Sequence, residues 1–447
     1  MSAASAPSSS ACLGAGPGPT AIPREGTVIS RRPSTPPPGP ARPSAAATTL
    51  RSARFGEVFS DGEFRALWLA QVLSVGGDQL ARVALTLLVF DRTGSSLLAA
   101  VTFAASVVPT FVGGITLSGL ADRWPRRRVM IVCDLGRALL VSIMAIPAVP
   151  IAGLVSLLVL VTLISAPFTS ARAALYPDIL TGDRFVLGTA ITLTTFQFGQ
   201  ALGFVVGGAV VGFFGVRVSL LADAVTFFVS AVIVRIWVQT RPAARAVSHP
   251  EAEGHEGPLT AVRLALTDPA LRTPMMFGWL AAFYNVPDGV SAPLAASLGG
   301  GAVAVGLILA SQAVGASVGV IAFSRLVAPA RRVLWMGPLA VTACGILIAF
   351  VLHPPLLVTL AILGLSGVFD CYQLAASASF VRAAPMRYRS SAFGVAQGGM
   401  SLGQGAAMIA AGAAAQWHSP SDVIAASGAV GAVCGMVIMA SRRRDRW

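Results

Sequence analysis

The stretch LADRWPRRRVMIVCDLGR, residues 120–137, places one aspartate and four arginines within seven residues and then returns to apolar sequence. It lies between two apolar runs, 97–121 and 128–149, and each of them is long enough to cross a bilayer, which takes about 20 helical residues. Charges in such a position indicate a short loop at a membrane surface. Because a loop of this kind connects two membrane spans, the apolar runs on either side of it are predicted to be transmembrane helices. The whole chain is therefore predicted to be a helical membrane protein.

Composition supports a membrane protein. The 447 residues are 55% hydrophobic and 11% charged, whereas soluble domains carry about 25% charged residues. The net charge of +13 does not indicate nucleic-acid binding, because the arginines fall between apolar runs and do not form one basic face. The five cysteines are scattered, without a CxxC pair or a histidine cluster, so we expect reduced packing residues and neither a metal site nor a cofactor.

Twelve apolar runs follow a tail rich in proline and serine. Each is close to the length of a transmembrane helix, and each is too long for a strand of a membrane barrel. The predicted spans are 66–90, 97–121, 128–149, 151–176, 187–214, 217–239, 273–297, 302–326, 332–352, 355–381, 389–416 and 421–441.

These spans predict an all-α integral membrane protein with twelve transmembrane helices in two pseudo-symmetric six-helix bundles. A disordered tail is expected at residues 1–60, and the bundles at 61–239 and 273–441. The charged, proline-punctuated stretch 240–272 would connect the bundles, and 442–447 would form a second tail.

The arginines between the spans predict the orientation. Nearly all of them lie in the tails and in the loops after spans 2, 4, 6, 8 and 10, whereas the opposite side holds only Arg92 and Arg217. Because cytoplasmic loops are enriched in basic residues, both termini are expected in the cytoplasm of a multi-pass plasma-membrane protein.

Short repeats relate the two halves of the chain. PRRRV at 125–129 corresponds to PARRV at 329–333, an offset of 204 residues, and the same offset relates Gly208 to Gly412. Many secondary transporters consist of duplicated halves that rock around a site near the bilayer midplane. The repeat therefore favours a transporter.

The loop after span 2 resembles the signature of the major facilitator superfamily, roughly G-x-L-a-D-R-x-G-R-R, although Ser118 and Pro125 stand where that pattern has glycines. In that family the loop aspartate bridges the two halves and holds the cytoplasmic side shut. The resemblance thus implies a conformational latch, against the simpler interpretation of a pure topology signal. The implied latch residues are Asp122, Arg123, Arg126 and Arg127.

Two further features resemble one branch of that family. Residues 64–95 are similar to the enterobactin and macrolide exporters. Span 5 carries a glycine pattern similar to the antiporter signature G-x-x-x-G-P-x-x-G-G, although Phe204 replaces its proline. Glycines four apart also serve ordinary close packing of helices. The resemblance implies proton-coupled efflux, and the glycines are Gly199, Gly203, Gly207 and Gly208.

Five acidic residues lie away from the ends of the predicted spans, where a charge costs about 2.5–3.5 kcal/mol or more: Asp78, Asp134, Asp223, Asp288 and Asp370. Arg82 lies one helical turn from Asp78, and Arg137 lies three residues from Asp134, so both pairs share a helix face. Asp134–Arg137 is interpreted as a structural pair. Asp370 has no partner on its own helix and is the first candidate for proton coupling, followed by Asp78 with Arg82.

A substrate pocket is expected among spans 1, 4, 7 and 10. Its aromatic and weakly polar side chains suit an amphiphilic organic molecule better than a sugar. The candidates are Phe168, Phe283, Tyr284, Asn285, Phe369, Tyr372 and Gln373.

Together these features predict a non-enzymatic secondary transporter that exports a drug, antibiotic or siderophore by proton antiport and confers antibiotic resistance. Its expected partners are the substrate, protons and the bilayer, with no nucleic acid and no obligate protein partner. A proton-coupled importer or a non-transporting membrane receptor on the same fold are the alternatives. No G-x-x-x-x-G-K-[ST] loop for ATP occurs in the sequence.

Overall fold

The computed structural model describes five parts of the chain, residues 55–117, 124–241, 263, 265–385 and 389–444. Every regular element in these parts is a helix. The prediction of an all-α protein is therefore confirmed for the described residues.

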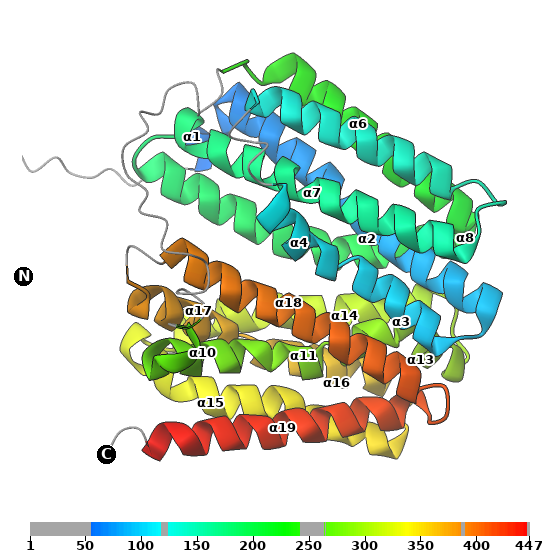
Figure 1. The fold of residues 1–447 in the computed structure, drawn as a ribbon, viewed down its shortest axis with the longest axis vertical. Coiled ribbons are helices and arrows are strands. Elements are labelled where there is room, and N and C mark those ends of the chain that lie inside the picture. Colours follow the sequence, from blue (N-terminus) through cyan, green and yellow to red (C-terminus); the bar gives the residue numbers. More distant parts are fainter. Residues whose placement is uncertain (1–54, 118–123, 242–262, 264, 386–388, 445–447) are drawn as a thin grey trace, which may run out of the picture. The chain divides into compact units, whose positions relative to one another are not determined.

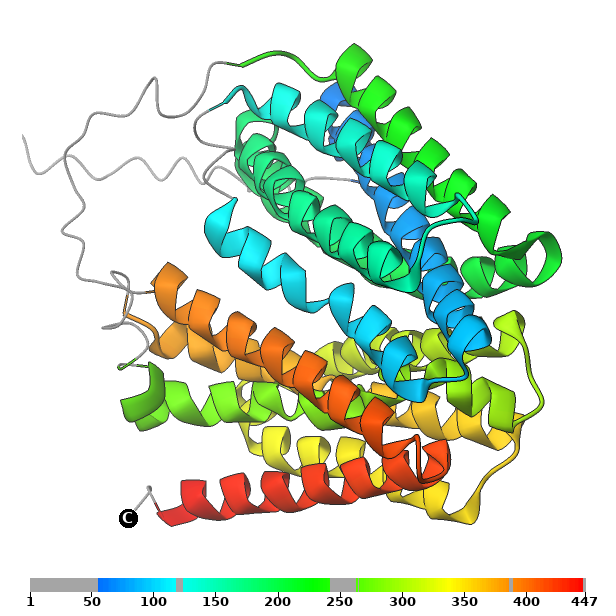
Figure 2. The ribbon, with the colours of Figure 1, turned by 45° about the vertical axis from the view of Figure 1, so that its right-hand side comes forward.

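The helices that precede residue 242 are called the N-terminal helices below. Figures 1 and 2 show them from blue to green. They are α1 (Phe55–Phe59), α2 (Gly62–Thr93), α3 (Ser96–Ala105), α4 (Val108–Thr116), α6 (Arg126–Met144), α7 (Ile151–Ile179) and α8 (Asp183–Trp237).

Helix α1 lies within residues 1–60, which the sequence analysis assigns to a disordered tail. Val58 is completely buried, and the Phe59 ring meets the Trp68 ring edge to face with 5.3 Å between the centroids. The tail prediction is therefore wrong for α1, because Val58 and Phe59 pack against α8 and α2. Residues 1–54 lie outside the described residues.

Helix α8 covers two predicted spans, 187–214 and 217–239. Its backbone leaves helical geometry at Gly215, where φ is 81° and ψ is 169°. This region of backbone space is accessible mainly to glycine. Ile191 from the first part and Val234 from the second belong to the same buried cluster, so the chain reverses direction at Gly215.

The helices after residue 264 are called the C-terminal helices. Figures 1 and 2 show them from green to red. They are α10 (Pro269–Trp279), α11 (Ala281–Tyr284), α12 (Val286–Gly289), α13 (Ser291–Ser297), α14 (Ala302–Leu326), α15 (Pro329–Gly345), the 3-10 helix η2 (Ile346–Leu352), α16 (Leu356–Phe369), α17 (Tyr372–Ala383), α18 (Arg389–Ala414) and α19 (Pro420–Arg444).

Several spans that the sequence predicts as continuous are divided, and two of them break at polar side chains. Residues 273–297 are divided among α10 to α13, with one break at Asn285, two residues before Pro287. Proline within a helix removes a backbone donor and crowds the preceding turn. Residues 355–381 are divided between α16 and α17, with the break at Asp370. Both breaks therefore coincide with a polar side chain that the sequence analysis selected.

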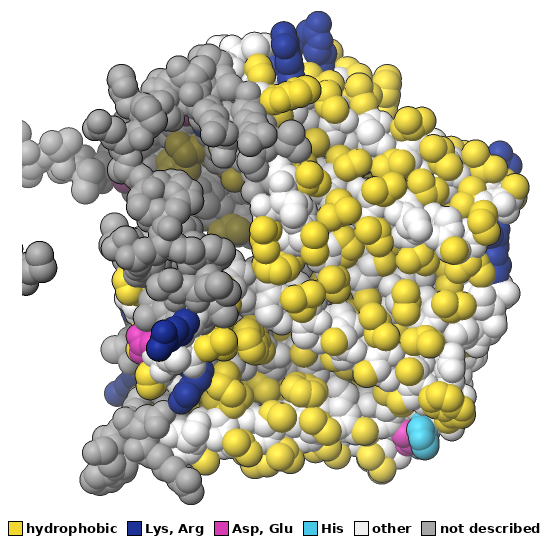
Figure 3. All heavy atoms as spheres, in the orientation of Figure 1, with side chains coloured by type: hydrophobic (Ala, Val, Ile, Leu, Met, Phe, Trp, Pro, Cys, Tyr) yellow, Lys and Arg dark blue, Asp and Glu magenta, His cyan; other side chains and the backbone are white. Residues whose placement is uncertain are grey.

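Eight helices are long and apolar enough to cross a membrane. Large apolar side chains are also exposed, including Phe213, Leu326 and Leu357, which are 79–82% exposed. Figure 3 shows hydrophobic side chains over most of the described surface in that view, with cationic residues near its edges. Such a surface is stable in lipid, so the chain is an integral membrane protein.

The N-terminal and C-terminal helices meet mainly at α18 and α14. Helix α18 packs along α3 and α4, and α14 packs against α8; Figure 2 shows α18 beside α4 and α3. The Gln416 side chain, just beyond α18, donates a hydrogen bond to Ser95 Oγ over 3.0 Å. One buried cluster includes side chains from both sets of helices, for example Phe227 and Phe277.

Candidate functional site

Arg137 is the centre of a buried polar cluster among the N-terminal helices. It lies on α6, and its side chain is 1% exposed. One nitrogen, Nη2, lies 2.5 Å from Asp78 Oδ1, and Nη1 donates to Ser74 Oγ over 3.0 Å. The guanidinium also lies over the Phe227 ring, 3.9 Å from its centroid. These contacts compensate the cost of burying a cation, since both the ion pair and the ring face favour positive charge.

Asp134 is the second acidic residue of this cluster and is completely buried. Its Oδ1 lies 3.8 Å from Arg137 Nη1, so the predicted pair is within ion-pair distance. Its Oδ2 accepts a hydrogen bond from Ser230 Oγ over 2.6 Å. Ser230 lies on α8 and Asp134 on α6, so this bond ties the two helices together.

Arg82 does not form the ion pair with Asp78 that the helical spacing allows. Its guanidinium donates to Gln79 Oε1 and to the backbone oxygen of Ser106, each over 3.3 Å. Asp78 is paired with the arginine of α6 instead, because that cation approaches from a neighbouring helix. Arg82 still interacts electrostatically with Asp78 and with Asp288, which lies on α12 among the C-terminal helices.

Asp223 belongs to the cluster but was not selected as a site residue from the sequence. It lies on the second part of α8 and is 1% exposed. Its Oδ1 lies 3.4 Å from Thr226 Oγ1, and its Oδ2 has no hydrogen-bond partner among the described residues. A Cβ atom at Gly77 would overlap this carboxyl group, so the glycine provides the space that it occupies beside Asp78. The sequence signal that could have identified Asp223 is the position of an acidic residue within an apolar span.

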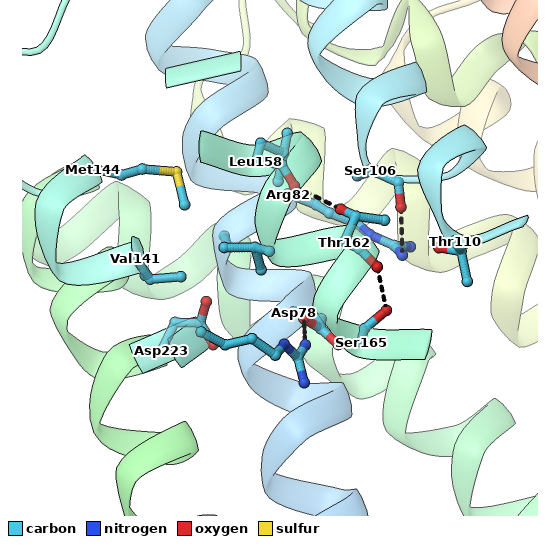
Figure 4. A pocket seen from close by; sticks show the side chains of 13 residues that line it. Asp78, Arg82, Ser106, Thr110, Val141, Met144, Leu158, Thr162, Ser165 and Asp223 are labelled. Carbon is cyan, nitrogen blue, oxygen red and sulfur yellow. Dashed lines mark hydrogen bonds and ion pairs between the residues drawn. The ribbon is translucent and has the colours of Figure 1, made fainter. Parts of the chain in front are cut away.

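A small cavity lies against the cluster. Its volume is about 40 Å³, and about 10–15 Å³ suffices for one water molecule. Figure 4 shows Asp78 and Asp223 on its wall, together with hydroxyl groups from α4 and α7. Polar side chains thus have room for water within a largely apolar protein. The lining residues are Asp78, Ala81, Arg82, Ser106, Thr110, Arg137, Val141, Met144, Leu158, Val161, Thr162, Ser165 and Asp223.

Asp370 is the centre of a second polar cluster, among the C-terminal helices. It lies at the break between α16 and α17 and accepts a hydrogen bond from Tyr284 Oη. Gln373 Nε2 lies 3.0 Å from the same Tyr284 oxygen and 3.0 Å from the backbone oxygen of Gly278. Within the described part of the chain, no arginine or histidine lies within 4.0 Å of Asp370. Among the described residues, this carboxyl group is therefore held by one neutral donor, the Tyr284 hydroxyl.

Two further substrate candidates adjoin this cluster. The Tyr372 ring lies edge to face against Tyr284, with 6.3 Å between the centroids. Asn285 Oδ1 accepts a hydrogen bond from Gln312 Nε2 over 2.6 Å. The breaks at Asn285 and Asp370 therefore bring polar side chains of α10 to α13 and of α16 and α17 together. In transporters, irregular backbone at membrane depth accompanies binding sites.

The three phenylalanines among the substrate candidates occupy other places. Phe168 is buried in the apolar cluster that contains Leu67 and Tyr176. Phe283 packs against Gly431 of α19. Phe369 is half-buried against the main core cluster. The Phe168 ring also lies beneath the guanidinium of Arg172, 5.8 Å from the ring centroid.

The loop after the second predicted span is only partly described, since Asp122 and Arg123 lie outside the described residues. Arg126 forms an ion pair with Asp178 at 2.5 Å and donates to the backbone oxygen of Ala174. Arg127 donates to Thr240 Oγ1 over 2.6 Å and to the backbone oxygen of Arg235. These partners of both arginines lie within or directly beyond the N-terminal helices.

The glycines of α8 lie at two different helix contacts. Gly203 and Gly207 face α2, where an added Cβ would lie 2.9 Å from Gln79 Cγ and 3.2 Å from Leu80 Cα, respectively. Gly199 has more space, because its nearest neighbour, Val75 Cγ1, would be 3.5 Å away. Gly208 instead faces α14. A Cβ there would lie 2.8 Å from the backbone oxygen of Ala302 and 2.9 Å from Gly306 Cα, on the C-terminal side of the interface.

Comparison with known sequences gives one family match. A model described as Major Facilitator Superfamily matches residues 67–288. This range includes the Arg137 cluster and the glycines of α8. No curated protein sequence matches the chain significantly.

Comparison with solved structures shows the same fold in several transporters. The nucleoside transporter NupG has a TM-score of 0.69 and 13% identity, and the match covers 85% of this chain and 98% of that one. A bacterial homologue of the human lysosomal transporter Spinster, inward-facing and occupied, has a TM-score of 0.66 and 15% identity, with 86% and 97% covered. A bacterial homologue of the iron transporter ferroportin, inward-facing, has a TM-score of 0.61 and 14% identity, with 86% and 99% covered.

Proposed function

We propose that this chain, which has the fold of major facilitator superfamily transporters, exports a lipophilic or amphiphilic small molecule by proton antiport. The family match and the transporter structures indicate a transporter and not an enzyme. The observation that carries the proposal is that carboxyl groups lie in two places within the apolar helices: Asp134 and Asp223 are buried around Arg137, and Asp370 is half-buried at the break between α16 and α17. A buried carboxyl group that gains and loses a proton can couple proton flow to transport.

The proposal includes twelve membrane spans in two six-helix bundles. Eight helices qualify by length and composition, and α8 counts among them as one helix although it contains the reversal at Gly215. Helix α6, the interrupted run α10 to α13, and α18 supply the other three spans. The bundles would then occupy residues 61–239 and 273–441, joined by a cytoplasmic loop at 240–272.

Two glycines support pseudo-symmetry between these bundles. Gly208 of α8 lies against Gly306 of α14, and Gly412 of α18 lies against Ala100 of α3. The two glycines are related by the repeat offset of 204 residues. Each packs its helix closely against a helix of the other half, which is the arrangement expected of duplicated halves that rock against each other. Alternating access through these two contacts is part of the proposal.

The roles of the site residues follow from their surroundings. Asp370 is the first candidate for proton coupling, because only neutral groups hold it, and Asp78 with Arg82 is the second. Substrate would contact Tyr284, Asn285, Tyr372 and Gln373, which lie at the helix breaks around Asp370. An aromatic wall with a few hydrogen-bonding groups suits an amphiphilic molecule.

The remaining assignments rest on the sequence together with the packing of α8. The glycine pattern of α8 supports export, and the arginine distribution supports a plasma-membrane protein with both termini in the cytoplasm. Asp122 would form the latch between the halves, with Arg123, Arg126 and Arg127 beside it.

A transport assay with a dye tests the proposal. Everted membrane vesicles from a bacterium without its own efflux pumps would be energised to an acid interior and given ethidium, a lipophilic cation. We expect accumulation of ethidium that stops when the pH gradient is dissipated. The matched control carries Asp78→Asn and Asp370→Asn together and should accumulate only the background amount.

A resistance screen complements this assay. Cells that express the protein should survive higher concentrations of lipophilic antibiotics than cells that express the double variant. Uptake driven by the pH gradient into intact cells would support an importer instead. Absence of movement in either direction, with all compounds of the screen, would favour a receptor.

A further inference from the structure

The cluster around Arg137 contains more carboxyl groups than the Arg137 guanidinium contacts. Asp78 and Asp134 both lie within 4.0 Å of the guanidinium, and Asp223 lines the same cavity. The shortest contact is made to Asp78, at 2.5 Å. Asp223 is therefore left as a deeply buried carboxyl group that has an acidic neighbour and, within the described part of the chain, no cation within ion-pair distance.

The groups that face Asp223 come from several elements. Helix α2 contributes Asp78, across Gly77, and α6 contributes Arg137 with Asp134 behind it. On α8 itself the neighbour is Thr226, whose hydroxyl donates to the backbone oxygen of Asp223 over 2.7 Å. Two other arginines lie farther away: Arg82 is hydrogen-bonded to Gln79 and Ser106, and Arg172 lies over the Phe168 ring, 5.8 Å from its centroid.

An ionised Asp223 would be costly in this place. A buried carboxylate is stable only when cations or several donors surround it. One oxygen, Oδ2, has no hydrogen-bond partner, and the hydroxyl of Thr226 is already committed to a backbone oxygen. A protonated carboxyl group avoids this cost, because it carries no charge and needs fewer donors.

We propose that Asp223 holds a proton in this conformation and exchanges it with Asp78 for the contact with Arg137. In the exchange the O–H bond of Asp223 breaks, the proton crosses the cavity to the Asp78 carboxylate, and the guanidinium turns toward the new carboxylate on α8. The number of protons and the total charge of the cluster stay unchanged. The Asp78 side chain is 31% exposed, so it can release the proton to water.

This inference rests on the proposed proton antiport and adds a residue to it. The exchange would connect the buried carboxyl group of Asp223 on α8 to the more exposed carboxyl group of Asp78 on α2, through Arg137 on α6. Asp223 lies on the second part of α8, whereas Gly208, which contacts α14, lies on the first part, before the reversal at Gly215.

Infrared spectroscopy of the purified protein tests the proton directly, without a substrate. A protonated carboxyl group has a carbonyl band that a carboxylate lacks. We expect such a band at neutral pH, and we expect Asp223→Asn to remove a component of it. Asp183→Asn, at the start of the same helix, is the control and should leave the band unchanged. A band that Asp223→Asn leaves intact, and that Asp134→Asn or Asp370→Asn removes completely, would overturn the proposal.

A second variant covers the case in which Asp223→Asn does not fold. Asp223→Glu keeps an acid at this position and should shift the carbonyl component in frequency without removing it; an unshifted band would count against the proposal. In vesicles, Asp223→Asn should still let ethidium equilibrate and should lose its accumulation against a gradient. If wild-type protein does not move ethidium, the export function fails, whereas the infrared result still decides the protonation of Asp223.

Discussion

The two polar clusters bury carboxyl groups in different ways. Around Arg137, on the N-terminal helices, acidic groups from three helices are arranged about one cation. At Asp370, on the C-terminal helices, one acidic group accepts a hydrogen bond from Tyr284, and Gln373 supports that tyrosine. The first cluster thus compensates charge with charge, and the second compensates it with a neutral hydroxyl donor.

This difference indicates which carboxyl groups can gain or lose a proton. An acid that is paired with a buried cation is held in its charged form, and removing the cation leaves a large uncompensated charge. An acid that is held by neutral donors tolerates either form, since protonation removes no ion pair. We therefore expect removal of the Arg137 cation to reduce stability most, and neutralisation of Asp370 to change coupling with little loss of stability.

The largest effect is expected when the cation is removed. Arg137→Met should lower the free energy of unfolding by about 3–5 kcal/mol, because it leaves buried carboxyl groups unpaired. The measurement is the unfolding midpoint in detergent. Arg82→Met is the control and should cost less, since Arg82 donates to neutral oxygens. If the two variants lose the same free energy of unfolding, Arg137 contributes no more to stability than Arg82 does.

A smaller loss is expected when the donor to Asp370 is removed. Tyr284→Phe should cost about 1.5–3 kcal/mol, the range for hydrogen bonds to a charged group. Tyr372→Phe is matched in size and burial, but its hydroxyl donates to the backbone oxygen of Phe277, so it should cost about 0.5–1.5 kcal/mol. If both changes cost the same in thermal unfolding, Asp370 is not ionised in this state.

Neutralising Asp370 should change stability little and coupling strongly. Asp370→Asn keeps an oxygen that accepts from Tyr284, so the cost should be about 1 kcal/mol or less. In the vesicle assay the variant should equilibrate ethidium but fail to concentrate it when a pH gradient is imposed. Accumulation at the wild-type rate would move the coupling role to the acids around Arg137.

The smallest effect on stability is expected at the latch, which should connect the halves that hold the two clusters. Asp122→Asn should impair transport more than Arg127→Gln, and both should change the unfolding free energy by about 0.5 kcal/mol or less, as at other surface positions. The reason is that Arg127 has neighbouring arginines and a counterpart at Arg331, whereas Asp122 has no counterpart in the second half. If the Asp122→Asn and Arg127→Gln variants transport at equal rates, the loop acts only as a topology signal and not as a latch.

Much of the fold follows from local sequence. The apolar runs predict the helices because their backbone groups must be satisfied within lipid. The reversal at Gly215 and the break at Asn285 coincide with residues that disfavour helix, although the sequence analysis treated 273–297 as continuous. The helix α1 was missed, because five residues are too short for a periodic signal and are stabilised by contact with Trp68.

The site was predictable only in part. Asp134 and Arg137 lie three residues apart, and helical geometry alone brings them within 3.8 Å. The same geometry suggested Asp78 with Arg82, yet the partner of Asp78 comes from another helix. Local spacing predicts contacts within a helix, and it carries no information about which neighbouring helix supplies a closer partner.

The sequence by itself determined the membrane setting, the helical class and the presence of costly charges inside apolar spans, because these depend on composition and on spacing along one helix. Only the tertiary structure decided which charges meet. Asp223 lies 145 residues from Asp78, and Asp370 lies 86 residues from Tyr284. Such pairs form when packed helices bring side chains together, and the free energy of burying a charge depends on those neighbours.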